Sequence, residues 1–277
     1  MAAMEPSAAR FDPQPFLRRV TADGTAYVDL GRGEPVVLIH GVGMRLEAWG
    51  PQLGALSQTH RIIAVDMPGH GESVPLPKGS DLAAFVAWFG RFQESLSLGR
   101  VNLAGHSMGA LIAGGAAATF PKRIRRVALL NGVHRRDAEA KSAVLARAAA
   151  IPVSGIDVDG PVKRWFCDDE ISHRAGALTR SWLTQMDHDA YATAYSAFAA
   201  GDAVYADAWR HVQCPALFLT GSDDPNSTPA MADAMAKLAP HGYARIIEGH
   251  RHMVNLTAPD DVNRLLREWL ATPEVTG

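Results

Sequence analysis

The sequence contains little cysteine. Two of its 277 residues are cysteines, Cys167 and Cys214, and two are too few for a disulfide framework. Neither lies in a Cys-x-x-Cys or a Cys/His pattern, so the sequence shows no metal-ligand spacing of that kind. We therefore expect free thiols in a reducing compartment and a fold that depends on neither a disulfide nor a metal.

The chain also lacks an excess of charge of one sign and any long apolar run. Its 27 Lys and Arg residues against 29 Asp and Glu residues give a net charge of −2, which argues against nucleic acid or an anionic membrane surface as a partner. The basic clusters at 122–126 and 135–136 are interpreted as solvated ends of helices and loops.

The longest uncharged apolar run, residues 108–118, is shorter than the ~18 residues that a membrane-spanning helix needs. Residues 1–11 show no secretory pattern, so we expect a cytoplasmic protein.

What the sequence does contain is typical of a globular α/β enzyme. Hydrophobic residues make up 47% and charged residues 20%, and the length allows one large domain or one domain with an insertion. Short β-rich runs alternate with longer helical patterns, which indicates a mostly parallel sheet with crossover helices. The expected strands span residues 16–21, 26–30, 36–39, 62–66, 101–104, 127–131, 216–220 and 244–247. The expected helices span residues 46–57, 81–97, 108–120, 229–238 and 259–270.

The alternation breaks between residues 133 and 211. This stretch is largely helical in pattern and shows no buried-strand run, and Tyr191, Tyr195 and Phe198 fall on one helical face. A helical insertion between two core strands explains the break. We expect residues 1–132 and 212–277 to form the core, and residues 133–211 to form a cap over the carboxyl ends of the strands, where open α/β sheets hold their ligands.

The segment Gly105-His106-Ser107-Met108-Gly109 is the main functional signal. It follows an expected strand and precedes a helix rich in small residues. A serine between strand and helix adopts a strained backbone, and glycines on both sides permit the tight turn. The turn lifts the hydroxyl above the sheet and directs a helix N-terminus at a developing anion. We expect Ser107 to be a nucleophile; the alternative is a glycine-rich turn whose serine merely caps the helix.

Acyl transfer also requires hydrogen-bond donors for an oxyanion. An earlier strand ends in a glycine-flanked loop, which brings backbone N–H groups close to a ligand. We expect the backbone amides of Val42 and Met108 to form the oxyanion hole. His40 is interpreted as a histidine that hydrogen-bonds this loop, and His70 and Ser73 as residues that hold the turn after the next strand.

The order of these motifs resembles that of the α/β-hydrolase superfamily. The motifs are His40-Gly41, Asp66-x-x-Gly69-x-Gly71-x-Ser73 and Gly105-x-Ser107-x-Gly109. The resemblance covers essentially the whole chain beyond the first ~15 residues, because the order of expected strands and helices matches as well. It implies an α/β-hydrolase fold with an eight-stranded, mostly parallel sheet, helices on both faces, and a triad in the chain order serine, acid, histidine.

The resemblance places the acid in a loop after a buried strand, a few residues beyond a glycine. Asp224 fits that spacing, and Asp223 is the alternative. The acid would fix the imidazole tautomer and stabilise the imidazolium. Of two histidines after the last expected strand, His252 lies seven residues before Pro259, an interval that resembles the superfamily's spacing from base to helix-starting proline. His250 is expected in the preceding loop.

The expected cap resembles that of 3-oxoadipate enol-lactonases. The similarity is carried by Arg164-Trp165-Phe166 and by a later tyrosine-rich helix, whereas residues 153–160 depart from that family. Trp165 is interpreted either as a wall of the acyl pocket or as a residue that packs the cap onto the core. Arg45 and Arg164 are candidates for bidentate binding of a substrate carboxylate, the alternative being solvated surface arginines.

Together these residues predict a serine hydrolase that cleaves a small carboxylic ester or (enol-)lactone through an acyl-enzyme, without metal or cofactor. Two alternatives use the same triad: hydrolysis of a C–C bond in a dicarbonyl compound, and perhydrolysis. A third alternative is a catalytically weak ligand receptor of the same fold. The sequence predicts no particular oligomeric state.

Overall fold

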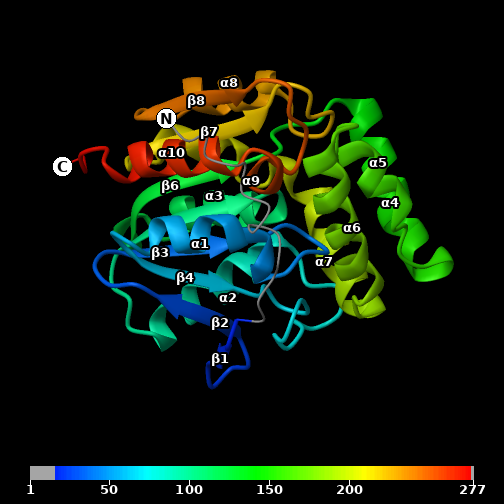
Figure 1. Ribbon diagram of the computed structural model, residues 1–277, viewed down its shortest axis with the longest axis horizontal. Coiled ribbons are helices and arrows are strands. Elements are labelled where there is room, and N and C mark those ends of the chain that lie inside the picture. The colour runs from blue at the N-terminus through cyan, green and yellow to red at the C-terminus, as the bar shows by residue number, and fades with distance from the viewer. Residues whose placement is uncertain (1–15, 276–277) are drawn as a thin grey trace, which may run out of the picture.

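The computed structural model describes residues 16–275 and shows one eight-stranded sheet with helices on both faces (Figure 1). The strand order is β1-β2-β4-β3-β5-β6-β7-β8. All neighbours from β4 to β8 pair in parallel, whereas β2 is antiparallel to both β1 and β4. The expected mostly parallel α/β fold is therefore confirmed. The strands are β1 (Arg19–Val20), β2 (Ala26–Leu30), β3 (Pro35–Ile39), β4 (Arg61–Val65), β5 (Val101–His106), β6 (Ile124–Leu130), β7 (Ala216–Gly221) and β8 (Gly242–Ile247).

Each expected strand appears, and the first differs most from its expected extent. Only Arg19 and Val20 of the expected strand 16–21 pair, with Tyr27 and Ala26 respectively. Both residues of β1 are exposed, so no apolar burial favours a longer pairing at this edge of the sheet.

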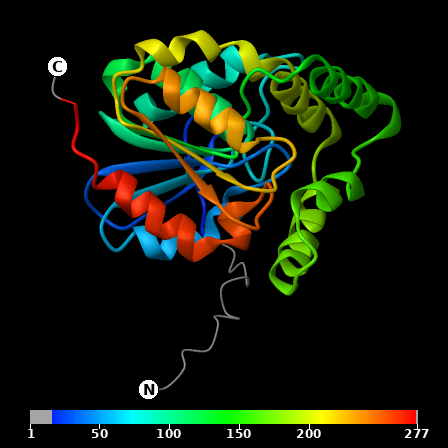
Figure 2. The same cartoon turned by 90° about the horizontal axis from the view of Figure 1, so that it is seen from above.

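Two helical layers cover the sheet. Alternate strand residues face opposite layers, as the period of two in a strand requires: Val37 and Ile39 pack with α2, α3 and α8, whereas Val36 and Leu38 pack with α1 and α10. Figure 2 shows the layers on opposite sides of the strands. The core helices and short turns of helix are η2 (Leu46–Trp49), α1 (Gly50–Leu56), α2 (Leu82–Ser95), α3 (Met108–Thr119), η3 (Pro121–Arg123), α8 (Pro229–Leu238), α9 (Val254–Thr257) and α10 (Pro259–Leu270).

The chain between β6 and β7 is entirely helical where it is regular. Its four longer helices, α4 to α7, gather at one end of the molecule, on the right in Figure 1, beyond the carboxyl ends of the parallel strands. Aspartates cap three of them: Asp137, Asp169 and Asp187 accept hydrogen bonds from the first-turn amides. These helices are α4 (Ala138–Ser154), α5 (Asp159–Trp165), α6 (Glu170–Thr184), α7 (His188–Ala200), η4 (Gly201–Ala203) and η5 (Ala206–His211).

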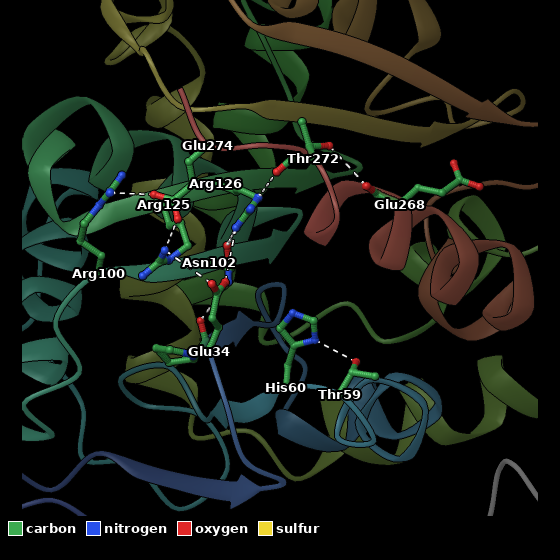
Figure 3. A network of polar contacts seen from close by, with 11 residues as sticks. Glu34, Thr59, His60, Arg100, Asn102, Arg125, Arg126, Glu268, Thr272 and Glu274 are labelled. Carbon is green, nitrogen blue, oxygen red and sulfur yellow. Dashed lines mark hydrogen bonds and ion pairs between the residues drawn. The ribbon is translucent and has the colours of Figure 1, made fainter. Parts of the chain in front are cut away.

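A polar network ties the amino ends of the parallel strands to the C-terminal segment (Figure 3). Arg126 in β6 donates to the Thr272 carbonyl at 2.7 Å and to Asn102 Oδ1 at 2.9 Å. Glu274 binds both Arg100 and Arg125. The side chain of Arg126 is 8% exposed, so the interpretation of cluster 122–126 as fully solvated is wrong for this arginine.

Three remaining expectations concern the chain as a whole. Cys167 and Cys214 are both free thiols. Within residues 16–275, no helix is long and apolar enough to span a membrane. The expectation for residues 1–11 lies outside the described residues.

Candidate active site

Ser107 lies at the sharp turn between β5 and α3. Its backbone has φ 54° and ψ −113°, a conformation that costs energy for a residue with a side chain. The turn depends on two glycines. A Cβ at Gly105 would lie closer than 3.0 Å to the Gly109 carbonyl, and one at Gly109 would lie closer than 3.0 Å to the Ile39 carbonyl. Only glycine fits at both positions, and these two residues therefore permit the tight turn in which Ser107 lies.

The structure brings together the serine, histidine and aspartate that the sequence singled out. Ser107 Oγ lies 3.0 Å from His252 Nε2, and His252 Nδ1 lies 2.8 Å from Asp224 Oδ2. All three side chains are buried, with Ser107 4% exposed and His252 2% exposed. Both contacts are within hydrogen-bond range, so a proton has a direct route from the hydroxyl to the imidazole.

Two neighbouring residues hold Asp224 as an acceptor. Asn131 Nδ2 donates to Asp224 Oδ2 at 2.8 Å, and the Asn226 amide donates to Oδ1 at 2.8 Å. Burial alone would raise the pKa of Asp224, but the charge of His252 and these hydrogen bonds outweigh burial and hold the pKa below its ordinary value. Asp224 is therefore ionised at neutral pH and accepts the N–H of His252.

Two further residues, His106 and Trp165, hold His252 in place. His106 Nε2 donates to the His252 carbonyl at 2.8 Å, and the Trp165 ring lies 5.4 Å from the imidazole, centroid to centroid. Burial lowers the pKa of His106 to about 3, so His106 is neutral and serves as a hydrogen-bond donor to the backbone. His252 therefore has a fixed main chain and an aromatic wall at its side.

The two candidate oxyanion donors belong to a residue of the same cavity as Ser107, Val42, and to the residue that follows Ser107, Met108. Val42 lines the same cavity as Ser107. Met108 is the first residue of α3, where backbone N–H groups have no acceptor within the helix. Gly43, next to Val42, donates its amide to His70 Nε2 at 3.0 Å, and the Met67 amide donates to His40 Nε2 at 3.0 Å. His40 and His70 thus hold the loops around the site.

A cavity of about 420 Å³, a volume that includes its open mouth, adjoins Ser107 and His252. Among residues 16–275, three arginines and no carboxylate line it. Of the expected substrate-binding residues, Arg164 and Trp165 line the cavity, and Arg45 does not. Arg45 donates instead to Gln185 at 3.2 Å, because its side chain reaches across to the end of α6. The cavity is lined by Val42, Ser107, Arg136, Val144, Arg147, Arg164, Trp165, Tyr195, Phe198, Asn226 and His252.

The alternative acid and base lie elsewhere. Asp223 is exposed and accepts a hydrogen bond from Ser222. His250 contacts Thr257 Oγ1 at 3.0 Å through Nδ1. Neither residue lies among those that line the cavity.

The sequence interpretation missed several cavity residues, and Arg136 is the main one. Cluster 135–136 was interpreted as solvated, but the side chain of Arg136 is only 5% exposed, because it packs over the Phe198 ring of α7 at 4.6 Å. The available signal was position: Arg136 follows shortly after β6, at the edge of the sheet where Ser107 lies. Arg147 and Tyr195 are held together by a 3.2 Å hydrogen bond, which the sequence does not indicate.

Comparison with known proteins finds a matching family model, related sequences and similar solved structures. Residues 36–265 match the family model described as "Alpha/beta hydrolase family". The chain is 50% identical over 246 residues to (E)-2-((N-methylformamido)methylene)succinate hydrolase of Acinetobacter baylyi, covering 89% of this chain and 94% of that protein. It is 37% identical over 123 residues to 2-hydroxy-6-oxo-2,4-heptadienoate hydrolase of Pseudomonas putida, covering 42% and 44%. Among solved structures, the enol-lactonase from Burkholderia xenovorans superposes with a TM-score of 0.81 and 26% identity, covering 92% of this chain and 100% of that one.

Proposed function

Because the chain belongs to the α/β-hydrolase family, we propose that this hydrolase uses Ser107 as its nucleophile, His252 as general base and Asp224 as the acid that orients the base. The observation that carries the proposal is the continuous hydrogen-bonded line from Ser107 Oγ through the imidazole to Asp224, with contacts of 3.0 and 2.8 Å. Such a line activates a serine that is unreactive by itself.

The reaction runs through an acyl-enzyme. His252 Nε2 takes the proton of Ser107 as Oγ attacks the substrate carbonyl, and the amides of Val42 and Met108 stabilise the resulting oxyanion. The bond to the leaving group breaks, and His252 gives that group the proton. Water then attacks the acyl-enzyme with His252 again as base, which releases the acid and restores Ser107. Every step uses groups of this chain and water, so the proposal includes no metal or cofactor.

The substrate in this proposal is a small dicarboxylate with an N-acyl group. Three guanidinium groups line the cavity, and no carboxylate does so in the part of the chain that the structure describes. This lining favours an anionic ligand, since arginine pairs with carboxylates in bidentate geometry. The relative that is 50% identical carries the name of a succinate derivative with an N-methylformamido group. We extend that substrate class to this chain, with a small molecule as its partner and neither nucleic acid nor a membrane.

In such a substrate the formyl carbon would be the site of attack. Formyl transfer to Ser107 breaks the C–N bond and leaves an enamine whose electron pair is delocalised towards the conjugated carboxylate. Delocalisation makes this nitrogen a better leaving group than an ordinary amine. Hydrolysis of the formyl-enzyme then yields formate. In this proposal helices of residues 133–211 act as the cap, and they supply Arg147, Arg164 and Trp165 to the cavity.

Hydrolysis of an ester or enol-lactone is the second candidate. It is supported by the fold and 26% identity shared with the enol-lactonase, and the same acyl-enzyme steps apply with an alkoxide or enolate as the leaving group. C–C bond hydrolysis has weaker support, because the relative of that kind aligns with 42% of this chain.

The test is a comparison of catalytic efficiencies on the formamido-methylene succinate, an enol-lactone, simple esters and a ring-cleavage dienoate. We expect the first to be the best substrate, with formate released one for one. We expect Ser107→Ala to lower kcat by about 10⁴- to 10⁶-fold and to leave the fold intact.

A matched pair of histidine variants tests the base. His252→Ala should abolish turnover, whereas His250→Ala should stay close to the unsubstituted enzyme, since His250 contacts Thr257 and lies outside the cavity. Equal losses in the two variants, or full turnover by Ser107→Ala, would overturn the assignment.

A further inference from the structure

Arg136 is an enclosed cation of the cavity. Its side chain is 5% exposed, its guanidinium lies over the Phe198 ring at 4.6 Å, and it lines the cavity together with Ser107. Burying a guanidinium is costly unless its charge and its N–H groups are compensated.

The hydrogen bonds of this guanidinium are incomplete. Nη1 donates to the Ala199 carbonyl at 3.4 Å and lies 3.5 Å from Asp202 Oδ1. The other carboxylate oxygen of Asp202, Oδ2, accepts a shorter hydrogen bond, at 2.7 Å, from the backbone amide of Arg136 and not from its guanidinium. Nη2 is buried and has no partner among the residues that the structure describes.

The nearby carboxylate of Asp202 offsets the burial of Arg136 only in part. Burial lowers the pKa of Arg136, and the positive charge of Arg147 adds to that effect, against the opposing influence of Asp202 and Tyr195. A contact chain joins the two arginines: Arg147 donates to Tyr195 OH at 3.2 Å, the Tyr195 ring lies 5.9 Å from that of Phe198, and Phe198 underlies Arg136. An anion placed in the cavity would therefore meet two guanidinium groups.

A purely structural role accounts for only part of this geometry. If Arg136 only joined the segment after β6 to the end of α7, it would need just two donors. These are its backbone amide, which binds Asp202, and Nη1, which binds the Ala199 carbonyl. Such a role gives no reason for a second nitrogen that is buried without an acceptor, in a residue that lines the cavity together with Ser107. Buried donors in folded proteins are nearly always satisfied, so an unsatisfied donor of a cavity residue is a candidate for contact with a ligand.

We propose that Arg136 Nη2 binds a carboxylate of the substrate, in a subsite that Arg136 shares with Arg147 and the Tyr195 hydroxyl. The inference rests on the proposed hydrolase function. It adds the residue that binds the end of the substrate farther from the scissile carbonyl. The ligand class is a short aliphatic carboxylate. The face of Phe198 below the guanidinium keeps water from the contact, which strengthens a charge-assisted hydrogen bond.

The probe is succinate, measured by calorimetry and as an inhibitor of 4-nitrophenyl acetate hydrolysis. We expect succinate to compete with the ester, and succinamide, which lacks the charges and is not an ester, to compete poorly. Arg136→Gln should weaken succinate binding by about tenfold or more, a much larger effect than its effect on the turnover of the uncharged ester or on the rate of Ser107 labelling by a fluorophosphonate.

Arg135→Gln is the matched control. Arg135 is the neighbouring arginine, its side chain is 50% exposed and pairs with Asp207 at 2.8 Å, so its loss should not change succinate binding. If Arg136→Gln does not fold, Arg136→Lys keeps the charge beside Asp202 and loses the second donor arm, and should still bind succinate more weakly.

The two proposals fail in different ways. Unchanged succinate affinity in folded Arg136→Gln or Arg136→Lys overturns the subsite, as does an equal loss of succinate binding and uncharged-ester turnover, which would mark Arg136 as structural. Absence of Ser107 labelling in the unsubstituted protein overturns the hydrolase mechanism alone, because calorimetry reports succinate binding without turnover.

Discussion

Replacing Asp224 by asparagine should leave two hydrogen-bond donors facing each other, in either orientation of the new side-chain amide. Asp224 Oδ2 accepts from His252 Nδ1 and from Asn131 Nδ2, each at 2.8 Å, and Oδ1 accepts from the Asn226 amide at 2.8 Å. A carboxylate accepts at both oxygens, whereas an amide has one acceptor and one donor group. If the amide NH₂ takes the Oδ1 position, it faces the N–H of Asn226. If it takes the Oδ2 position, it faces both His252 and Asn131.

The magnitude follows from that conflict. At least one buried donor loses its acceptor, at a cost of about 1–3 kcal/mol. For a chain of this size each kcal/mol shifts the melting temperature by about 2–4 °C. The loss of catalysis should be larger, about 10⁴-fold in kcat, because nothing then holds His252 in the tautomer that accepts the proton of Ser107.

The assay is kcat on the preferred substrate together with a thermal melt of the same sample. Asp223→Asn is the control, since Asp223 is exposed and lies outside the cavity, and it should match the unsubstituted protein in both measurements. A kcat for Asp224→Asn within about tenfold of the unsubstituted value, a change of only about 1.4 kcal/mol in barrier, would refute the reasoning.

Two further predictions concern the frame around the site. Gly109→Ala should fail to fold or lose more than about 3 kcal/mol of stability, because its Cβ would lie closer than 3.0 Å to the Ile39 carbonyl; urea unfolding measures this, and unaltered stability would contradict the turn geometry. Burial lowers the pKa values of His40, His70 and His106, to about 4 for His70 and about 3 for His106. The unfolded chain, with an ordinary histidine pKa of 6.5, therefore binds more protons than the native state below that pH, so stability should fall as the pH drops from about 6.5 towards 4, by up to about 1.4 kcal/mol per pH unit per histidine. Urea titrations at pH 7.5, 6 and 5 measure this slope, and equal free energies of unfolding across that range would show that these histidines are not buried and neutral.

The sequence predicted those parts of the molecule that depend on short stretches of chain. The parallel strands are continuous apolar runs, which their burial on two faces requires. Ser107 lies in a motif whose glycines and whose position between strand and helix are all local. Asp224 and His252 were selected because their spacing after a strand resembles that of the α/β-hydrolase superfamily, and the structure places His252 in contact with both Ser107 and Asp224.

The parts that the sequence did not predict depend on contacts between distant segments. Asn131 supports Asp224 from the end of β6, and an isolated asparagine carries no sign of such a contact. The sequence alone led to the interpretation of Arg136 as a solvated residue, whereas in the structure its guanidinium packs over the Phe198 ring of α7. Arg45 was an equally reasonable carboxylate ligand by type, but the end of α6 supplies Gln185 as its partner. Charge and residue type do not distinguish these outcomes; the packing of the helices between β6 and β7 does.

The network around Glu274 gives the C-terminal segment an orientation of practical use. Arg100 and Arg125 hold Glu274 at the amino ends of the strands, and Figure 1 shows this end of the chain on the side away from α4 to α7. An affinity handle or a solid support attached through a spacer after residue 277 would therefore lie on the side away from α4 to α7. Removing residues 272–277 to shorten such a fusion would instead take away the Thr272 carbonyl that Arg126 binds and the Glu274 carboxylate that Arg125 binds, and we expect it to lower stability at the base of the sheet.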